Sequence, residues 1–324
     1  MKVLVTGGLG YLGSVLTSNL VDKGFGVSIV DSGMYGNHLK KSVLDKTTLL
    51  MQRINKPNGE MSRLVAESDA VVHLAGVVGD QACDLFKEEA MSTNLTATKD
   101  LIKMCEKFNK KMLFASTCSV YGASNELLDE TSDILPLSTY AFSKYVAENM
   151  LSNSGVQFTA FRFGTLFGFS DRMRFDLVVN TFVGRAMAGK KITVFGGDQY
   201  RPFLHIRDAS RFITEALETD IFDRGVYNLG GVNVKIGDLG DEIKRHFKDA
   251  DVEATRETKD ARNYRVDSSR VLKTFKSRFA YGIPDGIREM KKGIEDAGIK
   301  DFDSTIYSNV EHMRSVLGKT KANN

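Results

Sequence analysis

The sequence predicts an α/β fold in which a doubly wound parallel sheet carries a smaller α+β lobe at its C-terminal side. In the first half, short apolar runs rich in β-branched residues alternate with stretches of helical periodicity. A Gly-rich turn, 7–13, joins the first apolar run to the first helical stretch. After about Gly164 the alternation gives way to longer helical patterns with short, scattered strand-like pieces.

The runs expected as strands are apolar on both faces, as in a parallel sheet that is covered by helices. They are 2–6, 27–31, 70–75, 111–116 and 156–161, with a weaker run at 49–54. Helical periodicity fills the intervals at 11–23, 61–67, 91–108 and 140–153. Because crossovers between parallel strands are right-handed, this series predicts a doubly wound sheet.

The second half is expected to form the smaller lobe. Its strand-like pieces are 192–195, 203–206 and 226–229, and its helical patterns are 175–188, 208–217, 236–247, 268–274 and 284–297. Since no Ser/Gly/Pro-rich linker separates the halves, we expect two lobes that enclose a cleft. The predicted division is 1–165 and 166–324, with some crossing of the chain between the two.

Composition limits the partners. The 324 residues include 44 Lys and Arg against 41 Asp and Glu, a net charge of +3. So small a surplus argues against nucleic acid or a membrane as a partner bound through bulk charge. No apolar run approaches the ~20 residues that span a bilayer. Three widely spaced cysteines and the lack of an HExxH pattern predict reduced thiols, a cytoplasmic location and no metal site.

The strongest local signal is the segment Thr6-Gly-Gly-Leu-Gly-Tyr-Leu-Gly13, which follows a strand and precedes a helix. Gly7, Gly10 and Gly13 allow a sharp turn, close approach of a pyrophosphate and close packing of the helix on the strand. The helix N-terminus offers N–H groups to the phosphates. Asp31 ends the next strand, where a carboxylate accepts from ribose hydroxyls and would repel a 2′-phosphate. This pattern predicts a dinucleotide site that prefers NAD to NADP.

A second pattern predicts proton chemistry. Tyr140 and Lys144 lie one helical turn apart after Ser138, a residue suited to cap the helix. A neighbouring ammonium and the nicotinamide cation are expected to lower the pKa of the Tyr140 phenol, which could then exchange a proton with a hydroxyl during hydride transfer. Thr117 follows a strand at the edge where open α/β sheets bind ligands, so it could hydrogen-bond the same oxygen.

Seven segments occur in order along about residues 1–290: TGGLGYLG, the strand-ending Asp31, HLAG, Asn94 in NLTAT, STCSVYG, YAFSK and RPFLHIRD. Together they resemble the extended short-chain dehydrogenases/reductases of the NAD-dependent nucleotide-sugar epimerase/dehydratase family. The resemblance implies an NAD-binding Rossmann domain, a lobe for a nucleotide-diphosphate sugar and oxidation at sugar C4. It also implies a homodimer in which helices 91–108 and 140–153 of two subunits form a four-helix bundle.

The residues expected at the site follow from these patterns and from the resemblance. Thr117, Tyr140 and Lys144 match the catalytic triad of the family. The cofactor-binding set is Gly7, Gly10, Tyr11, Leu12, Gly13, Asp31, Ser32, Ile54, Leu74, Ala75, Gly76, Asn94, Ser116, Tyr140 and Lys144. The substrate-binding set is Thr117, Tyr140, Thr165, Arg174, Phe195, Arg201 and Arg256. Arg201 and, more loosely, Arg256 match positions that meet the substrate diphosphate, whereas Arg172 and Arg174 are equally compatible with a surface loop.

Departures from the family pattern narrow the expected reaction. The two residues after Thr117 are Cys118 and Ser119, where 4,6-dehydratases carry an acid and a base, so that chemistry is disfavoured. Cys118 is an acid/base thiol in one interpretation and a buried small side chain in the other, which we favour. The expected function is an NAD-dependent epimerase that works through a 4-keto sugar. The alternatives are a 4-dehydrogenase or dehydratase and a non-catalytic NAD-binding scaffold.

Overall fold

The computed structural model describes residues 1–255, 257 and 262–318. Seven parallel strands form the main sheet, in the order β11-β7-β5-β4-β1-β2-β3. They are β1 (Lys2–Thr6), β2 (Gly26–Asp31), β3 (Thr47–Met51), β4 (Ala70–His73), β5 (Lys111–Thr117), β7 (Phe158–Phe163) and β11 (Gly225–Leu229). The order reverses between β1 and β4, as in a dinucleotide-binding sheet. The expected doubly wound fold is confirmed.

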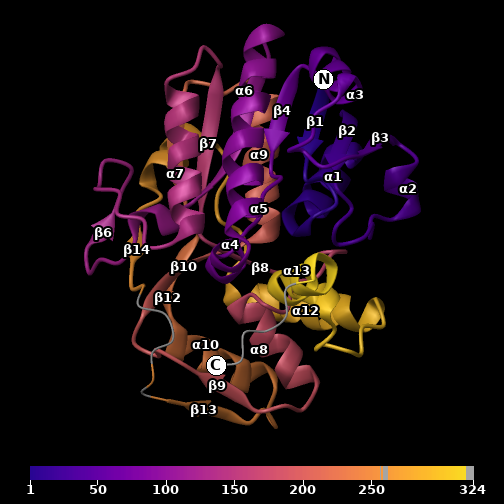
Figure 1. Ribbon diagram of the computed structural model, residues 1–324. Helices are drawn as coiled ribbons and strands as arrows, with labels where there is room; N and C mark the ends of the chain where they lie inside the picture. Colours follow the sequence, from indigo (N-terminus) through magenta and orange to yellow (C-terminus); the bar gives the residue numbers. More distant parts are fainter. Residues whose placement is uncertain (256, 258–261, 319–324) are drawn as a thin grey trace.

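Helices cover both faces of this sheet (Figure 1). One face packs against α1 (Tyr11–Asp22), α2 (Lys41–Leu44), α9 (Ile206–Glu218) and α11 (Ser269–Thr274). The other face packs against α3 (Gly59–Glu67), α6 (Ala97–Lys107) and α7 (Thr139–Ser152). Short helices α4 (Asp80–Leu85) and α5 (Lys87–Met91) precede a π-helical turn, η1 (Ser92–Thr96), that runs into α6. The expected helix at 91–108 is therefore the end of a longer helical segment with a π turn inside it.

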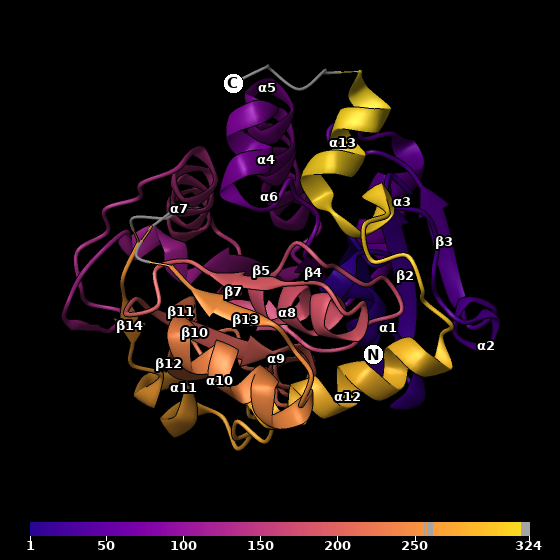
Figure 2. The same ribbon diagram turned by 90° about the horizontal axis from the view of Figure 1, so that it is seen from below.

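The smaller lobe surrounds a separate apolar core. Its helices are α8 (Val178–Met187), α10 (Ile236–His246) and α12 (Ile283–Asp296), and its short strands are β8 (Thr165–Phe167), β9 (Ile192–Val194), β10 (Tyr200–His205), β12 (Val232–Lys235) and β13 (Val252–Ala254). Two strands, β6 (Leu127–Leu128) and β14 (Arg265–Val266), pair beside it, and η2 (Cys118–Tyr121) and η3 (Thr305–Tyr307) are single 3₁₀ turns. The chain described ends with α13 (Asn309–Leu317), which Figure 2 shows apart from the rest of this lobe.

The chain crosses between the lobes more than the sequence indicates. The assignment of 226–229 to the smaller lobe is wrong, because β11 extends the main sheet beside β7. The helix expected at 208–217 also leaves that lobe, since α9 packs on α1 under the main sheet. After residue 165, β11, α9 and α11 therefore belong with the main sheet, and α8, α10 and α12 belong with the smaller lobe. Among the described residues no helix has both the length and the apolar character needed to cross a bilayer.

Candidate active site

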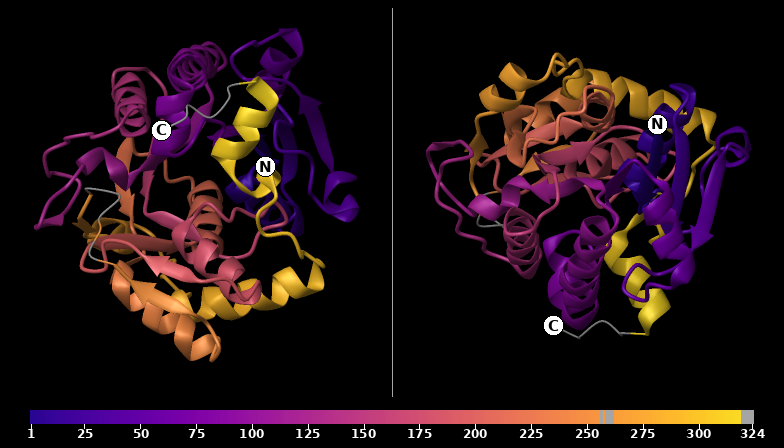
Figure 3. Two further views of the ribbon diagram at one scale, coloured as in Figure 1. Left: turned by 60° about the horizontal axis from the view of Figure 1, so that its bottom comes forward. Right: turned by 90° about the horizontal axis from the view of Figure 1, so that it is seen from above.

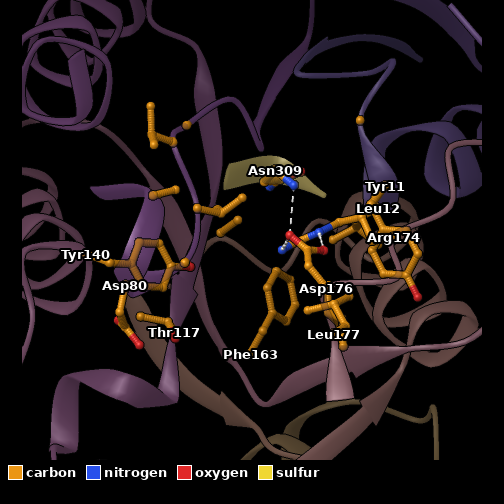
Figure 4. A pocket seen from close by; sticks show the side chains of 18 of the residues that line it. Tyr11, Leu12, Asp80, Thr117, Tyr140, Phe163, Arg174, Asp176, Leu177 and Asn309 are labelled. Carbon is orange, nitrogen blue, oxygen red and sulfur yellow. Dashed lines mark hydrogen bonds and ion pairs between the residues drawn. The ribbon is translucent and has the colours of Figure 1, made fainter. Parts of the chain in front are cut away.

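A cavity of about 930 Å³ opens at the carboxyl ends of the main strands and runs between the two lobes. Figure 4 shows Tyr140, Thr117 and Asp80 on one side of it and Tyr11, Leu12 and Arg174 on the other. The cavity wall includes every residue of the expected site except Asn94 and Arg256. Arg256 lies outside the described residues. Side chains that are widely separated in sequence are thus brought to one concave surface, at the place where open α/β sheets bind ligands.

The Gly-rich turn has the shape that a pyrophosphate requires. Gly7 adopts φ +76°, and a Cβ there would lie 2.7 Å from the backbone N of Ala75. A Cβ on Gly13 would lie 2.0 Å from the carbonyl oxygen of Gly7, so this glycine lets α1 pack on the turn. A Cβ on Gly10 would meet only that same oxygen, at 3.2 Å, which leaves its other side open towards the cavity. The three glycines therefore have distinct roles, and the residues present fit a dinucleotide.

Asp31 completes the cofactor side of the cavity. Its Oδ2 accepts a hydrogen bond from the Leu9 amide at 3.0 Å, and its Oδ1 accepts one from the Gly33 amide at 2.9 Å. Burial raises the pKa of Asp31, and these hydrogen bonds oppose the shift. The carboxylate is therefore fixed in place at the end of β2, where an adenosine ribose is expected.

Asn94 lies behind the cavity wall and not on it. It belongs to the π turn η1 and is 2% exposed. Its side chain accepts from the Val77 amide at 2.8 Å and donates to the Val77 carbonyl at 2.9 Å and to the Ser143 hydroxyl at 3.1 Å. Asn94 thus fixes the loop after β4, and the cofactor contact expected from the resemblance stays a prediction.

Tyr140, Lys144 and Thr117 meet on one wall. Ser138 caps α7 by accepting from the Ala141 amide at 3.2 Å, as expected, so that Tyr140 and Lys144 lie in the first turns of the helix. The Tyr140 phenol and the Thr117 side chain both border the cavity, and Thr117 lies near enough to act on the pKa of the phenol. The Lys144 ammonium donates to the carbonyl oxygen of Ala115 at 2.8 Å and lies 4.8 Å from the centre of the Phe114 ring. Both contacts anchor Lys144 to β5.

Burial is the largest influence on the pKa values of Tyr140 and Lys144. It raises the pKa of the Tyr140 phenol, and the Thr117 side chain and the charge of Arg174 offset only part of the shift. Burial also lowers the pKa of Lys144 to about 8. In the protein alone, loss of water around the phenol therefore sets the direction of the shift. The lowering of the Tyr140 pKa expected from Lys144 together with the nicotinamide cation stays a prediction.

A buried ion pair holds the strand ends behind the catalytic wall. Glu148 of α7 and Arg162 of β7 have side chains that are 4% and 6% exposed, and Arg162 Nη2 donates to Glu148 Oε2 at 2.7 Å. The hydroxyl of Ser116, the residue before Thr117, donates to the same carboxylate. Ser116 borders the cavity, but its side chain is engaged with Glu148. We infer that this network positions Thr117.

Cys118 faces away from the cavity. It is fully buried, and its thiol donates to the Arg162 carbonyl oxygen at 3.1 Å. Burial raises its pKa above the ordinary range of a thiol. These observations agree with the interpretation as a small buried side chain, whereas Ser119 does border the cavity.

The opposite end of the cavity carries the residues expected for substrate. Arg201 is 7% exposed and lies 5.6 Å from the centre of the Tyr264 ring, and Phe195 and Thr165 border the same space. Arg174 forms an ion pair with Asp176, at 2.8 Å, beside Tyr11 (Figure 4). That places Arg174 next to the Gly-rich turn, so its position favours the cofactor half of the cavity more than the substrate half.

Among the wall residues absent from the expected set are Asp80 and the start of the last helix. Asp80, the first residue of α4, forms an ion pair with Arg262 at 2.5 Å and accepts from the Ser138 hydroxyl at 2.5 Å. Nothing in the local sequence links Asp80 to Arg262. The other group is the start of α13, where Asn309, Val310 and Glu311 border the cavity. Apolar residues spaced three and four apart, Val310, Met313 and Leu317, are the signal that could have revealed this helix.

Comparisons with known proteins agree with this geometry. A model of the family described as NAD dependent epimerase/dehydratase matches residues 3–230. Among curated proteins, one named as an uncharacterized UDP-glucose epimerase of Bacillus subtilis is 28% identical over 273 residues, which cover 77% of this chain and 85% of that protein. A UDP-N-acetyl-alpha-D-glucosaminuronate decarboxylase of Bacillus cytotoxicus is 28% identical over 247 residues, 72% of this chain and 76% of that protein.

Solved structures give the same fold over almost the whole chain. The UDP-glucuronic acid 4-epimerase of Bacillus cereus, in complex with UDP-glucuronic acid and NAD, superposes with a TM-score of 0.81. It is 25% identical and covers 92% of this chain and 100% of its own. The described residues contain no group of three or more His, Cys, Asp or Glu that could hold a metal ion.

Proposed function

This chain belongs to the NAD dependent epimerase/dehydratase family, and we propose that it is an NAD-dependent epimerase of a nucleotide-diphosphate sugar that works through a 4-keto intermediate. The observation that carries the proposal is the cavity itself. Its wall holds Tyr140, Thr117 and Lys144 together with the glycines that fit a dinucleotide. A reaction that removes a proton from a sugar hydroxyl and a hydride from the carbon that bears it needs acid/base side chains next to a dinucleotide site.

In the proposed mechanism Tyr140 takes the proton of the C4 hydroxyl and later returns it. Thr117, which borders the cavity on the same wall as the phenol, orients the sugar oxygen towards it. Lys144 holds the nicotinamide ribose and stabilises the charge that develops on Tyr140. NAD, when bound, supplies the hydride acceptor and a positive charge next to the phenol. The sugar would then present its other face within the same cavity, and Tyr140 would return the proton to the oxygen.

The chemistry of the side chains supports binding of NAD at one end of the cavity and of the nucleotide sugar at the other. The Gly-rich turn, Asp31 and Ser32 suit the adenosine and pyrophosphate of NAD, with Ile54, Leu74, Ala75 and Gly76 along its length. Arg201 suits the diphosphate of the nucleotide sugar, because a guanidinium pairs with phosphate oxygens in a planar fork. Phe195 offers an apolar face to the nucleotide base.

The test is to incubate the protein with a panel of UDP-, GDP-, CDP- and dTDP-sugars and to follow the products by NMR. We expect inversion at C4 of one substrate with no net formation of NADH. Steady accumulation of NADH would contradict the epimerase and favour the 4-dehydrogenase. Tyr140→Phe should lower kcat by about 10²- to 10⁴-fold, the usual contribution of a positioned acid/base. Tyr145→Phe, on the same helix but away from the cavity wall, is the matched control.

The expected assembly and location stay proposals. A homodimer is supported by α6 and α7, which run side by side on one face of the sheet (Figure 1) and are the helices expected in an intersubunit bundle. Light scattering that shows a monomer would refute it. A cytoplasmic location is supported by Cys83, Cys105 and Cys118, which are all unpaired and buried.

A further inference from the structure

Arg172 is a buried cation whose charge nothing in the described part of the chain pairs directly. It lies between β8 and α8 and is 2% exposed. Its Nη2 donates to Asn309 Oδ1 at 2.7 Å, and its guanidinium stacks 4.2 Å from the centre of the Tyr35 ring. Its Nε has no hydrogen-bond partner, and it makes no ion pair with a described carboxylate. Because a buried charge is costly when it is unpaired, this arrangement points to an anion supplied by a ligand.

The position of Arg172 identifies which part of the cavity that anion occupies. Arg172 borders the cavity, and the amide of Arg172 donates to the Ser170 hydroxyl at 3.3 Å. The Ser170 hydroxyl in turn donates to the carbonyl oxygen of Tyr11 at 2.8 Å and contacts the Ser14 hydroxyl at 2.8 Å. Tyr11 and Ser14 belong to the first turn of α1, where the Gly-rich turn runs into the helix. Arg172 is thus tethered beside the place where a cofactor pyrophosphate fits.

The neighbouring charges leave Arg172 in need of an anion. Asp176 is the nearest candidate, but Arg174 engages both of its oxygens, at 2.8 and 3.1 Å. Asp31 acts on Arg172 only through space. Burial and the charge of Arg174 lower the pKa of Arg172 to about 10, so that it is still charged at neutral pH.

The same contacts tie Arg172 to the C-terminal helix. Asn309, which accepts from Arg172, is the first residue of α13, and its amide donates to Asp176 Oδ2 at 2.8 Å. Further along α13, His312 Nε2 is hydrogen-bonded to the Met34 carbonyl oxygen at 2.6 Å, and the fully buried Met313 packs with α4. Figures 2 and 3 show α13 crossing from the side of β2 to that of α4 and α5. The helix therefore closes one side of the cofactor half of the cavity.

We propose that Arg172 binds the diphosphate of the cofactor and, through Asn309, couples cofactor binding to the docking of α13. Binding of the anion completes the pairing of Arg172, and Arg172 then holds Asn309 and the helix over the site. Release of the cofactor requires the helix to move. The proposal rests on NAD dependence and not on the sugar reaction, so its test is independent of the substrate.

A diphosphate is also part of the nucleotide sugar, and the experiment separates the two sources. Calorimetric titration of the cofactor-free protein with NAD, ADP-ribose, adenosine and UDP is compared between the wild type and Arg172→Met. We expect the Kd of NAD and of ADP-ribose to rise by about 10- to 100-fold, the usual effect of losing a charge-assisted hydrogen bond. The Kd of adenosine and of UDP should not change. A rise for UDP instead would assign Arg172 to the substrate and overturn the proposal.

Two controls separate this role from a structural one. Arg207→Met removes an exposed Arg that pairs with Glu289 away from the cavity, and it should leave every Kd unchanged. The melting temperature of cofactor-free Arg172→Met should equal or exceed that of the wild type, because an unpaired buried charge has been removed. A fall in that temperature, with no change in NAD affinity, would show a structural residue and refute the proposal. Arg172→Lys, which keeps a charge, should recover part of the affinity.

The coupling to α13 has its own measurement. In the wild type, NAD should slow amide hydrogen exchange across residues 309–317. In Asn309→Ala the cofactor should still bind, with a faster dissociation rate, and should no longer protect these amides. Equal protection in the wild type and in Asn309→Ala would overturn the coupling. Val316→Ala, at an exposed position of the same helix, is the matched control.

Discussion

Removal of Glu148 should destabilise the protein more than most single substitutions, because it leaves the buried charge of Arg162 without its carboxylate partner. The Glu148 carboxylate accepts from Arg162 Nε at 3.0 and 3.2 Å and from Nη2 at 2.7 Å, and it also accepts from the Ser116 hydroxyl. Breaking a buried pair by removing one partner costs about 3–5 kcal/mol. We therefore expect Glu148→Leu to lower the free energy of unfolding by about 3–5 kcal/mol.

The assay is urea unfolding of the cofactor-free protein, followed by circular dichroism, with the slope m compared between variants. The double variant Glu148→Leu/Arg162→Met removes both charges and fills a similar volume with apolar atoms. Since such replacements are often neutral, it should recover most of the loss. A loss below about 1 kcal/mol in Glu148→Leu would refute the reasoning. A double variant that is less stable than either single variant would also refute the reasoning. In that case the unpaired charge of Arg162 would not be what destabilises Glu148→Leu.

The remaining predictions concern the catalytic wall. Lys144 has a pKa of about 8 in the folded protein, below its usual value of 10.5, so the unfolded chain binds more protons between these two values and stability should rise with pH across that window. Lys144→Met should remove this rise and add up to about 3 kcal/mol of stability at pH 7, as measured by urea unfolding at several pH values. Cys118→Ala should leave kcat within about 2-fold of the wild type in the product assay, because its thiol faces Arg162 and not the cavity. A loss of 100-fold or more would restore the acid/base interpretation of this thiol.

The parallel core of the fold could be predicted because its signal is local. Strands buried on both faces are runs of apolar residues, and the glycine turn places the first helix directly after the first strand. The last strand of the sheet, β11, was assigned to the wrong lobe because its sequence, GVYNL, shows only that it is a short buried strand. Its partner β7 is distant in sequence, and pairing of that kind leaves no local pattern.

The same limit applies to the site. Gly7, Asp31, Tyr140 and Lys144 lie in motifs whose spacing is fixed by one turn or one helix, so sequence could place them. Asp80, at the start of α4, and Arg262 lie far apart in sequence and meet only in the folded chain. Nor could the sequence give the protonation of Tyr140, since desolvation depends on everything packed around the phenol.

The raised pKa of Tyr140 is consistent with its proposed role. A phenol that was already ionised in the empty cavity would be a buried anion, which the protein would have to pair. The structure instead keeps Tyr140 neutral and leaves its ionisation to the ligands. A bound NAD would supply a positive charge beside the phenol, which favours the phenolate before the sugar is oxidised. Tyr140 would then accept the proton of the sugar hydroxyl and, once that charge is lost, would hold it as a neutral phenol until the oxygen takes it back.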